Sequence, residues 1–220
     1  MTDPLPKLAD LEAIVFDFDG VILESAVGKG DAFQELFSEH HEHLKAIREH
    51  HLQNLGVSRY QKFDWIYRNL FGRELPDAER QELGEKYSEL VFPRTVGSPF
   101  VPGALVLLER LVGRLPLFIA SATPQTELEA VVRQRGLNRF FAEVHGSPPA
   151  KGTILVEIVE AGGFEAKRVL MIGDGVSDLE AANHAGCLFL ARLDEAAPRQ
   201  PFPTEIPFVR NLAEAAEALF

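Results

Sequence analysis

Acidic side chains follow two apolar runs of this chain, each at the point where a β-strand is predicted to end. Asp17 and Asp19 close the run "AIVFDFDG", and Asp174 closes "RVLMIGD", with Asp178 four residues later. Residues two apart in a strand point to the same side, so the carboxylates of Asp17 and Asp19 can face one site. A buried carboxylate without a partner is energetically costly. The pattern therefore predicts that a cation lies among these carboxylates.

A hydroxyl and a lysine accompany the carboxylates. Ser121 ends the run "LPLFIAS", and Lys151 opens a predicted helix. Oxygen ligands suit Mg²⁺, and a hard cation with a lysine and a hydroxyl makes a receptor for a transferring phosphoryl group. One carboxylate can attack and form an aspartyl phosphate, while the second protonates the leaving oxygen and later takes a proton from water. We expect crowding to raise the pKa of this second carboxylate, and metal contact to lower that of the nucleophile.

The elements that would position these groups alternate between strand and helix. Strands are predicted at 12–18, 115–123, 140–146, 168–175 and 187–192, and helices at 102–113, 123–136, 151–163, 177–186 and 211–220. For the helix at 123–136 we expect Thr123 as N-cap, Pro124 at the first position and Gly136 beyond the end. The Pro-rich segment 194–207 is predicted to be an exposed loop. This alternation predicts an α/β fold with a doubly wound, mainly parallel, Rossmann-like sheet that binds ligands beyond the carboxyl ends of its strands.

Between these parts, residues 25–95 show helical patterns only, at 30–55, 58–72 and 76–92, with Ser58 as a candidate N-cap. We therefore predict an α/β core made of residues 1–24 and 96–220, with an inserted α-helical cap at 25–95. The cap carries a histidine cluster, which raises the hypothesis of a zinc site: His40, His41, His43, His50 and His51. Neighbours one or two apart do not share a helix face, so we favour a solvated or packing role for them.

Composition limits the function classes. The 220 residues are 46% hydrophobic and carry a formal net charge of -11, which disfavours general binding to nucleic acid or to an anionic membrane. The single cysteine excludes an internal disulfide, and we see neither a signal peptide nor an apolar run of membrane-spanning length. We expect a cytoplasmic protein, monomeric or weakly homodimeric, whose partner is a small phosphorylated metabolite.

Four motifs together resemble the haloacid dehalogenase-like superfamily of phosphotransferases, in its order and spacing and over nearly the whole chain: "DFDGV" from Asp17, "IASAT" at Ser121, "PAKG" at Lys151 and "GDGVSD" ending at Asp178. The resemblance implies the fold of that family, with a mobile α-helical cap of the C1 type that excludes water. It also implies a hydrolase acting on phosphoric monoesters, because members that cleave carbon–halogen or carbon–phosphorus bonds are expected to lack Asp19.

By the same resemblance, Asp17 is the nucleophile and Asp19 the general acid/base. The Asp17 carboxylate, the Asp19 backbone carbonyl and Asp174 would hold Mg²⁺, with the help of Asp178. Ser121 and Lys151 would bind the phosphoryl oxygens, next to the further substrate-binding candidates Gly20 and Ala122.

The cap segment "LGVSRYQKF" resembles the "GVSR" loop of β-phosphoglucomutases, so Arg59 is a candidate for binding a second anionic group of the substrate. Lys29, a further substrate-binding candidate, falls where a mutase would be expected to have a histidine, and "GDGVSD" looks more like the phosphatase form of the last motif. We therefore expect a Mg²⁺-dependent phosphatase acting on a sugar phosphate or a phosphoglycolate-like metabolite. The alternatives are a sugar phosphomutase, a non-catalytic phospho-aspartate switch and a binding protein that retains the fold.

Overall fold

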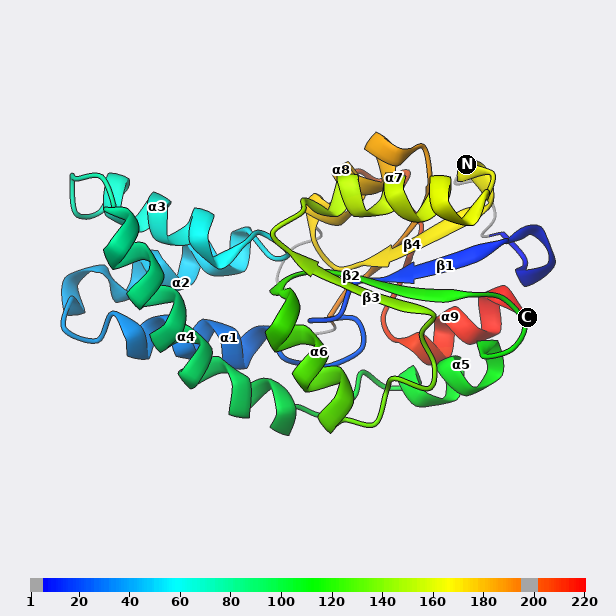
Figure 1. Cartoon of the computed structure of the whole chain (residues 1–220), viewed down its shortest axis with the longest axis horizontal. Coiled ribbons are helices and arrows are strands. Elements are labelled where there is room, and N and C mark those ends of the chain that lie inside the picture. Colours follow the sequence, from blue (N-terminus) through cyan, green and yellow to red (C-terminus); the bar gives the residue numbers. More distant parts are fainter. Residues whose placement is uncertain (1–5, 195–201) are drawn as a thin grey trace.

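The computed structural model describes residues 6–194 and 202–220, and a six-stranded parallel sheet forms the centre of that part of the chain (Figure 1). The strands are β1 (Ala13–Phe16), β2 (Leu117–Pro124), β3 (Glu143–Ser147), β4 (Val169–Gly173), β5 (Leu188–Arg192) and β6 (Phe208–Val209). Their order is β3-β2-β1-β4-β5-β6, so the winding direction reverses beside β1. This is the switch point at which open parallel sheets bind ligands, and the predicted fold class is confirmed.

Helices cover both faces of the sheet (Figure 1). One face carries α7 (Lys151–Gly162) and α8 (Val176–Ala185), and the other carries α5 (Ala104–Leu111), α6 (Gln125–Gln134) and α9 (Leu212–Leu219). The alternation along β1 explains the two cores, because Ile14 and Phe16 join one apolar cluster while Ala13 and Val15 join the other. Short 3₁₀ turns lie at Leu8–Asp10, His41–His43 and Ala166–Arg168. No helix in the described ranges combines the length and the apolar character needed to cross a bilayer.

Four further helices lie beyond the carboxyl end of β1, to the left in Figure 1: α1 (Ala26–Leu36), α2 (Leu44–Gln53), α3 (Arg59–Asn69) and α4 (Asp77–Gly97). They enclose their own apolar cluster, which includes Phe33, Phe63 and Tyr87. The Oγ of Ser58 accepts a hydrogen bond from the backbone N–H of Tyr60, as expected of the N-cap of α3. The division into cap and core at residues 24/25 and 95/96 stays a prediction.

The prediction of one continuous helix over 30–55 was wrong. The chain leaves helix at Phe37, turns through His41–His43 and starts α2 at Leu44. As a result, the rings of Phe33 and His51 lie 5.2 Å apart, whereas a straight helix would separate residues 18 positions apart by about 27 Å. Burial of Phe33 and Phe37 in the cluster of the four helices outweighs continuation of the helix. Helix α4 also runs further than predicted, to Gly97, with Pro93 inside it.

The start of α6 was also predicted wrongly. Thr123 belongs to β2, and Pro124 is the N-cap, without a side-chain cap. The chain stays extended there because Pro124 pairs with Ser147 after a shift in register. Gly136 follows the end of α6 with a φ of 68°, as expected. The sequence did not predict the two-residue strand β6, and part of the predicted 194–207 loop lies outside the described residues. Its described remainder contains no helix or strand, although Phe202 is buried.

Candidate active site

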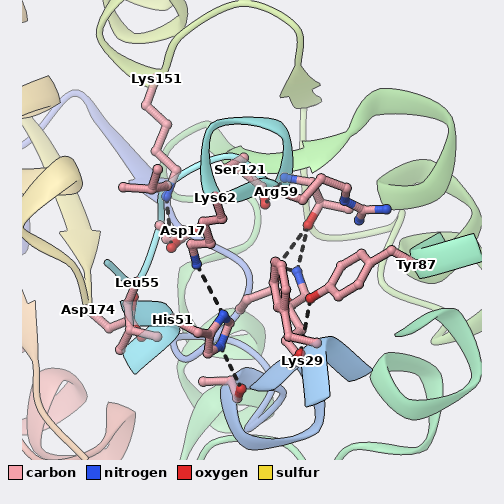
Figure 2. Close-up of a pocket in the computed structure, with 17 residues that line it drawn as sticks. Asp17, Lys29, His51, Leu55, Arg59, Lys62, Tyr87, Ser121, Lys151 and Asp174 are labelled. Atoms are coloured by element: carbon pink, nitrogen blue, oxygen red, sulfur yellow. Dashed lines mark hydrogen bonds and ion pairs between the residues drawn. The ribbon is translucent and has the colours of Figure 1, made fainter. Parts of the chain in front are cut away.

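A pocket of about 50 Å³ lies where β1, β2 and β4 end and is covered by the four helices inserted after β1 (Figure 2). Most of the residues predicted from the motifs line it: Asp17, Asp19, Lys29, Arg59, Ser121, Ala122, Lys151 and Asp174. Gly20 and Asp178 lie behind this lining and contact it. The tertiary structure therefore brings together side chains that are spread over more than 150 positions of the sequence.

Lys151 joins two of the carboxylates. As the first residue of α7 it places Nζ 2.9 Å from Oδ2 of Asp17 and 2.5 Å from Oδ1 of Asp178. Asp178 is completely buried in the first turn of α8, where its Oδ2 accepts the N–H of Gly175. The two carboxylates raise the pKa of Lys151 against the opposing effect of its burial. Lys151 therefore stays charged while it faces the pocket.

The acidic side chains fit a divalent metal ion. Ligand oxygens of Asp17, Asp174 and Asp178 lie within 4.8 Å of one another, and Oδ1 of Asp174 is buried without a hydrogen-bond partner. Burial, together with the carboxylates of Asp17 and Asp178, raises the pKa of Asp174 well above its usual value. A hard cation such as Mg²⁺ would satisfy the orphaned oxygen and remove this repulsion.

Gly20 makes the close approach to Asp174 possible. Its φ is 80°, and a Cβ at this position would lie 2.0 Å from Oδ2 of Asp174. Only glycine therefore fits without displacing a candidate metal ligand. The carbonyl of Gly20 also accepts a hydrogen bond from the guanidinium of Arg192. Its contribution in this structure is to make room for Asp174, and the predicted contact with substrate stays a prediction.

Asp17 and Ser121 form the floor of the pocket. Oδ1 of Asp17 accepts the N–H of Phe18 at 2.7 Å, and burial raises the pKa of Asp17 to about 7, although Lys151 lowers it. The Oγ of Ser121 accepts the N–H of Thr123 at 3.2 Å, which leaves its O–H as a donor toward the pocket. A carboxylate oxygen and a hydroxyl donor therefore face the same small volume.

Three donors hold the carboxylate of Asp19: Ser25 Oγ at 2.6 Å, Lys29 Nζ at 2.5 Å and Thr123 Oγ1 at 2.9 Å. Burial raises its pKa, but the charge of Lys29 and these hydrogen bonds outweigh burial and lower the pKa of Asp19. The expectation that crowding raises this pKa was therefore wrong, because it did not include Lys29. The structure therefore places the ammonium group of Lys29 in direct contact with the carboxylate of Asp19.

Arg59 lines the pocket, and three of its five N–H donors are used by Ser88 and Glu127. NH1 and NH2 make a two-pronged ion pair with Glu127 of α6, at 2.9 and 2.7 Å, and NH1 also donates to Ser88. The guanidinium stacks on the ring of Tyr87. This pair connects α3 to the helix that follows β2. A role of Arg59 in binding substrate stays a prediction.

Sequence reasoning missed a fourth cation in the pocket, Lys62, and its neighbour His51. Lys62 lies one turn after Arg59 in α3, and residues three apart share a helix face. That spacing was the available signal. His51 comes from another of the four inserted helices, α2, and no local pattern relates it to the site.

The other cap histidines pack against aromatic rings. His40 and His43 contact Phe71, and His50 stacks on Trp65 with 3.7 Å between the ring centroids. Within the described residues, no group of side chains placed to share a metal ion contains a histidine. The zinc hypothesis therefore finds no support there, and the packing role predicted for the cluster is confirmed for these residues.

Comparison with known proteins agrees with the motifs. A phosphoglycolate phosphatase of Synechococcus elongatus is 25% identical over 191 residues, which cover 82% of this chain and 83% of that protein. The crystal structure of a predicted phosphoglycolate phosphatase from Haemophilus somnus superposes with a TM-score of 0.72 at 17% identity, over 94% of this chain and 97% of the other. A putative β-phosphoglucomutase from Bacteroides vulgatus gives a TM-score of 0.76 at 15% identity, over 99% and 92%.

The structural likenesses show the fold, and the family follows from the sequence itself. The family model described as haloacid dehalogenase-like hydrolase matches residues 11–186 and so spans every motif that predicted the site. A phosphatase name among the relatives agrees with the predicted hydrolysis of phosphoric monoesters. The chain belongs to the haloacid dehalogenase-like hydrolase family.

Proposed function

We propose that this protein is a Mg²⁺-dependent phosphatase that hydrolyses a small phosphorylated metabolite of the phosphoglycolate or sugar phosphate type through an aspartyl phosphate. The observation that carries the proposal is the convergence of Asp17, Asp174 and Asp178 on one another and on Lys151, with Ser121 in the same pocket. Acids, a lysine and a hydroxyl around one small volume suit a phosphoryl group better than any other common ligand.

In the first step, a carboxylate oxygen of Asp17 attacks the phosphorus atom and the ester P–O bond breaks. Lys151 and Ser121 donate hydrogen bonds to the non-bridging oxygens, whose charge grows in the transition state. Asp19 donates a proton to the leaving oxygen. Its pKa is lowered in the structure, and the approach of a dianionic phosphoryl group raises it again because like charges disfavour ionisation. The products are the alcohol and the Asp17 aspartyl phosphate.

In the second step, water attacks the phosphorus atom of the aspartyl phosphate, and Asp19 accepts a proton from that water. The acyl phosphate bond breaks, inorganic phosphate leaves and the Asp17 carboxylate is restored. Lys29, Ser25 and Thr123 favour the ionised form of Asp19, which is the form that this step requires. Asp17, Asp174 and the carbonyl of Asp19 would hold the Mg²⁺ ion, with Asp178 beside them; the ion would neutralise phosphoryl charge.

The cap would exclude water from the first step. The loop before α3 packs directly on the core: Ser177 Oγ donates to the carbonyl of Leu55, and a Cβ on Gly56 would lie 3.3 Å from Nζ of Lys151. Together with the Arg59–Glu127 ion pair, this contact keeps the helices closed over the pocket. Substrate must therefore enter and product leave by movement of the cap.

The test is phosphate release from a panel of phosphate monoesters: 2-phosphoglycolate, hexose and pentose phosphates, sugar-acid phosphates and nucleotides. Release should need Mg²⁺, stop with a chelator and fall at least 1,000-fold, roughly the contribution of a nucleophile acting with its partners, in Asp17→Asn. Isomerised sugar phosphate formed after activation by a sugar bisphosphate would identify a phosphomutase instead. A stable acyl phosphate without turnover would identify a switch. A monomeric or weakly dimeric state and a cytoplasmic location stay predictions.

A further inference from the structure

Four cationic side chains line the pocket, and one of them differs from the others. Lys29 pairs with Asp19, Lys151 pairs with Asp17 and Asp178, and Arg59 pairs with Glu127. Lys62 has no carboxylate within ion-pair distance among the described residues; its Nζ contacts only the Nδ1 of His51, at 3.2 Å. Figure 2 shows this contact inside the pocket. One pocket cation is therefore left without a directly paired carboxylate.

The partner of Lys62 is a neutral histidine. The Nε2 of His51 lies 3.3 Å from the carbonyl oxygen of Ala26, which can only accept, so Nε2 carries the hydrogen and Nδ1 accepts from Lys62. Burial and the charge of Lys62 lower the pKa of His51 to about 3, which agrees with the neutral ring. His51 therefore orients the ammonium group and occupies one of its three donors. Two N–H groups remain for a ligand.

Lys62 is too buried for water to compensate its charge. Its side chain is only 4% exposed and lies over the ring of Phe33, and desolvation lowers its pKa to about 7. A buried ammonium group without an anion is costly. In an enzyme pocket, the missing anion can be supplied by the substrate, and binding then restores the charge balance of the site.

We infer that Lys62, oriented by His51, is the binding site for an anionic group on the alcohol part of the substrate, away from the phosphoryl group, and that this group is a carboxylate. The inference rests on the proposed function and deepens it. Lys62 comes from α3, whereas the residues that would bind the phosphoryl group come from the sheet and the helices that follow its strands. One ammonium charge balances the single charge of a carboxylate, and the two N–H groups that remain on Lys62 match the two carboxylate oxygens, whereas a second phosphate would bring two charges.

The inference also separates Lys62 from Arg59. Both come from the same face of α3, but three N–H groups of Arg59 already donate hydrogen bonds to Glu127 and Ser88. Arg59 keeps two further N–H groups, but Glu127 already balances its charge, so a substrate anion there would place a second carboxylate on one cation. Lys62 can bind a substrate anion without losing an existing partner. The "GVSR" segment therefore identifies α3 as the helix that faces the substrate. The cation on this helix without a paired carboxylate is Lys62, one turn after Arg59.

A binding experiment tests the inference directly, in the full-length protein with Mg²⁺. The probes are three non-hydrolysable ligands: 3-phosphonopropionate, which carries a carboxylate, propylphosphonate, in which a methyl group replaces it, and propane-1,3-bisphosphonate. Lys62→Met keeps most of the unbranched side chain and removes its charge. Lys45→Met removes the charge of an exposed lysine on α2 (side chain 88% exposed) and is the matched control.

We expect Lys62→Met to weaken 3-phosphonopropionate about 10–100-fold, as the loss of a hydrogen bond between charged groups predicts, and to weaken propylphosphonate less than about threefold. Lys45→Met should change neither. Equal weakening of these two ligands would overturn the inference, because it would place Lys62 at the phosphoryl group. No weakening of either would also overturn it. A larger loss for the bisphosphonate than for 3-phosphonopropionate would assign the subsite to a second phosphate and overturn the carboxylate assignment.

Turnover separates the failure of this inference from the failure of the proposed function. With 2-phosphoglycolate and ethyl phosphate as substrates, Lys62→Met should raise KM for the former far more than for the latter and leave kcat within about threefold. If wild type releases phosphate from both esters and the variant loses the same factor on each, the phosphatase stands and the subsite falls. If wild type releases phosphate from no ester of the wider panel, the proposed function falls while the binding comparison still decides the subsite.

Discussion

Lys29 Nζ lies 2.5 Å from Oδ2 of Asp19, and the two residues share Thr123 Oγ1 as a common partner. Lys29 belongs to α1, the first helix after the β1 motif, and Asp19 to the loop that carries the proposed acid/base. A helix of the segment inserted after β1 therefore controls the charge of a group in the loop that directly follows β1. This relationship makes the proton chemistry of the site sensitive to the position of α1.

Lys29→Met removes the ammonium group that holds the pKa of Asp19 below its ordinary value. The variant carboxyl should therefore keep its proton up to a higher pH, so the basic limb of the kcat/KM profile, set by loss of the proton that Asp19 donates in the first step, should move to higher pH. The measurement is the pH–rate profile at saturating Mg²⁺, with the exposed lysine variant Lys86→Met as control. A basic limb that stays in place would separate Lys29 from the titration of Asp19.

Asp174→Asn should weaken Mg²⁺ binding at least about 10–100-fold, because it removes a candidate ligand whose Oδ1 has no other partner. The same variant should be at least as stable as wild type without metal. The folded-state pKa of Asp174 is raised, so its negative charge destabilises the fold above the unfolded pKa. Thermal unfolding with and without Mg²⁺ tests both points. A metal-dependent rise in Tm as large as that of wild type would contradict the assignment of Asp174 as a ligand.

Glu127→Gln leaves the guanidinium of Arg59 buried without its counter-charge, since the Arg59 and Glu127 side chains are only 5% and 8% exposed. Breaking a buried pair from one side costs about 3–5 kcal/mol. The double variant Arg59→Met/Glu127→Gln should lose less stability than the sum of the two single variants. Urea unfolding of all four proteins measures this coupling. Additive losses would show that the pair does not link the cap to α6.

Lys62→Met should change how stability depends on pH. The pKa of Lys62 is lowered to about 7 in the folded protein, from an unfolded value of 10.5. As pH falls from about 10.5 to about 7, the unfolded chain takes up this proton and the folded chain does not, so the free energy of unfolding of wild type falls by about 1.4 kcal/mol per pH unit. The variant lacks this loss. Urea unfolding at pH 7 and pH 9.5 should therefore show a larger gain over wild type at pH 7, and an equal gain at both would be inconsistent with a buried charged lysine.

Much of the site could be predicted because its residues occupy fixed places relative to strand ends. Asp17, Ser121 and Asp174 each follow or close a run of β-formers, and parallel strands bring such residues to one edge of the sheet. Lys151 and Asp178 are one step further, in the first turns of the helices that follow. For these residues a local pattern is enough, because the fold class alone decides where they meet.

The contacts made by the cap could not be predicted in the same way. Whether Lys29 reaches Asp19 and whether Arg59 is free or paired with Glu127 depend on how four helices pack against the core. The error over 30–55 has the same origin, since a local helical pattern does not report the turn at His41–His43. The pKa of Asp19 was mispredicted because its strongest favourable charge comes from that packing.

The sequence by itself determined the alternation of strands and helices, and with it the sheet, the place of the site and the carboxylate, hydroxyl and lysine groups at its floor. These features follow from short-range periodicity and from the geometry of parallel strands. Only the tertiary structure decided which cations are paired, that His51 faces Lys62, and that Lys62 keeps donors for a ligand. The physical reason is that charge balance in a buried site depends on distances of a few ångströms between segments distant in sequence, and periodicity along a chain does not encode them.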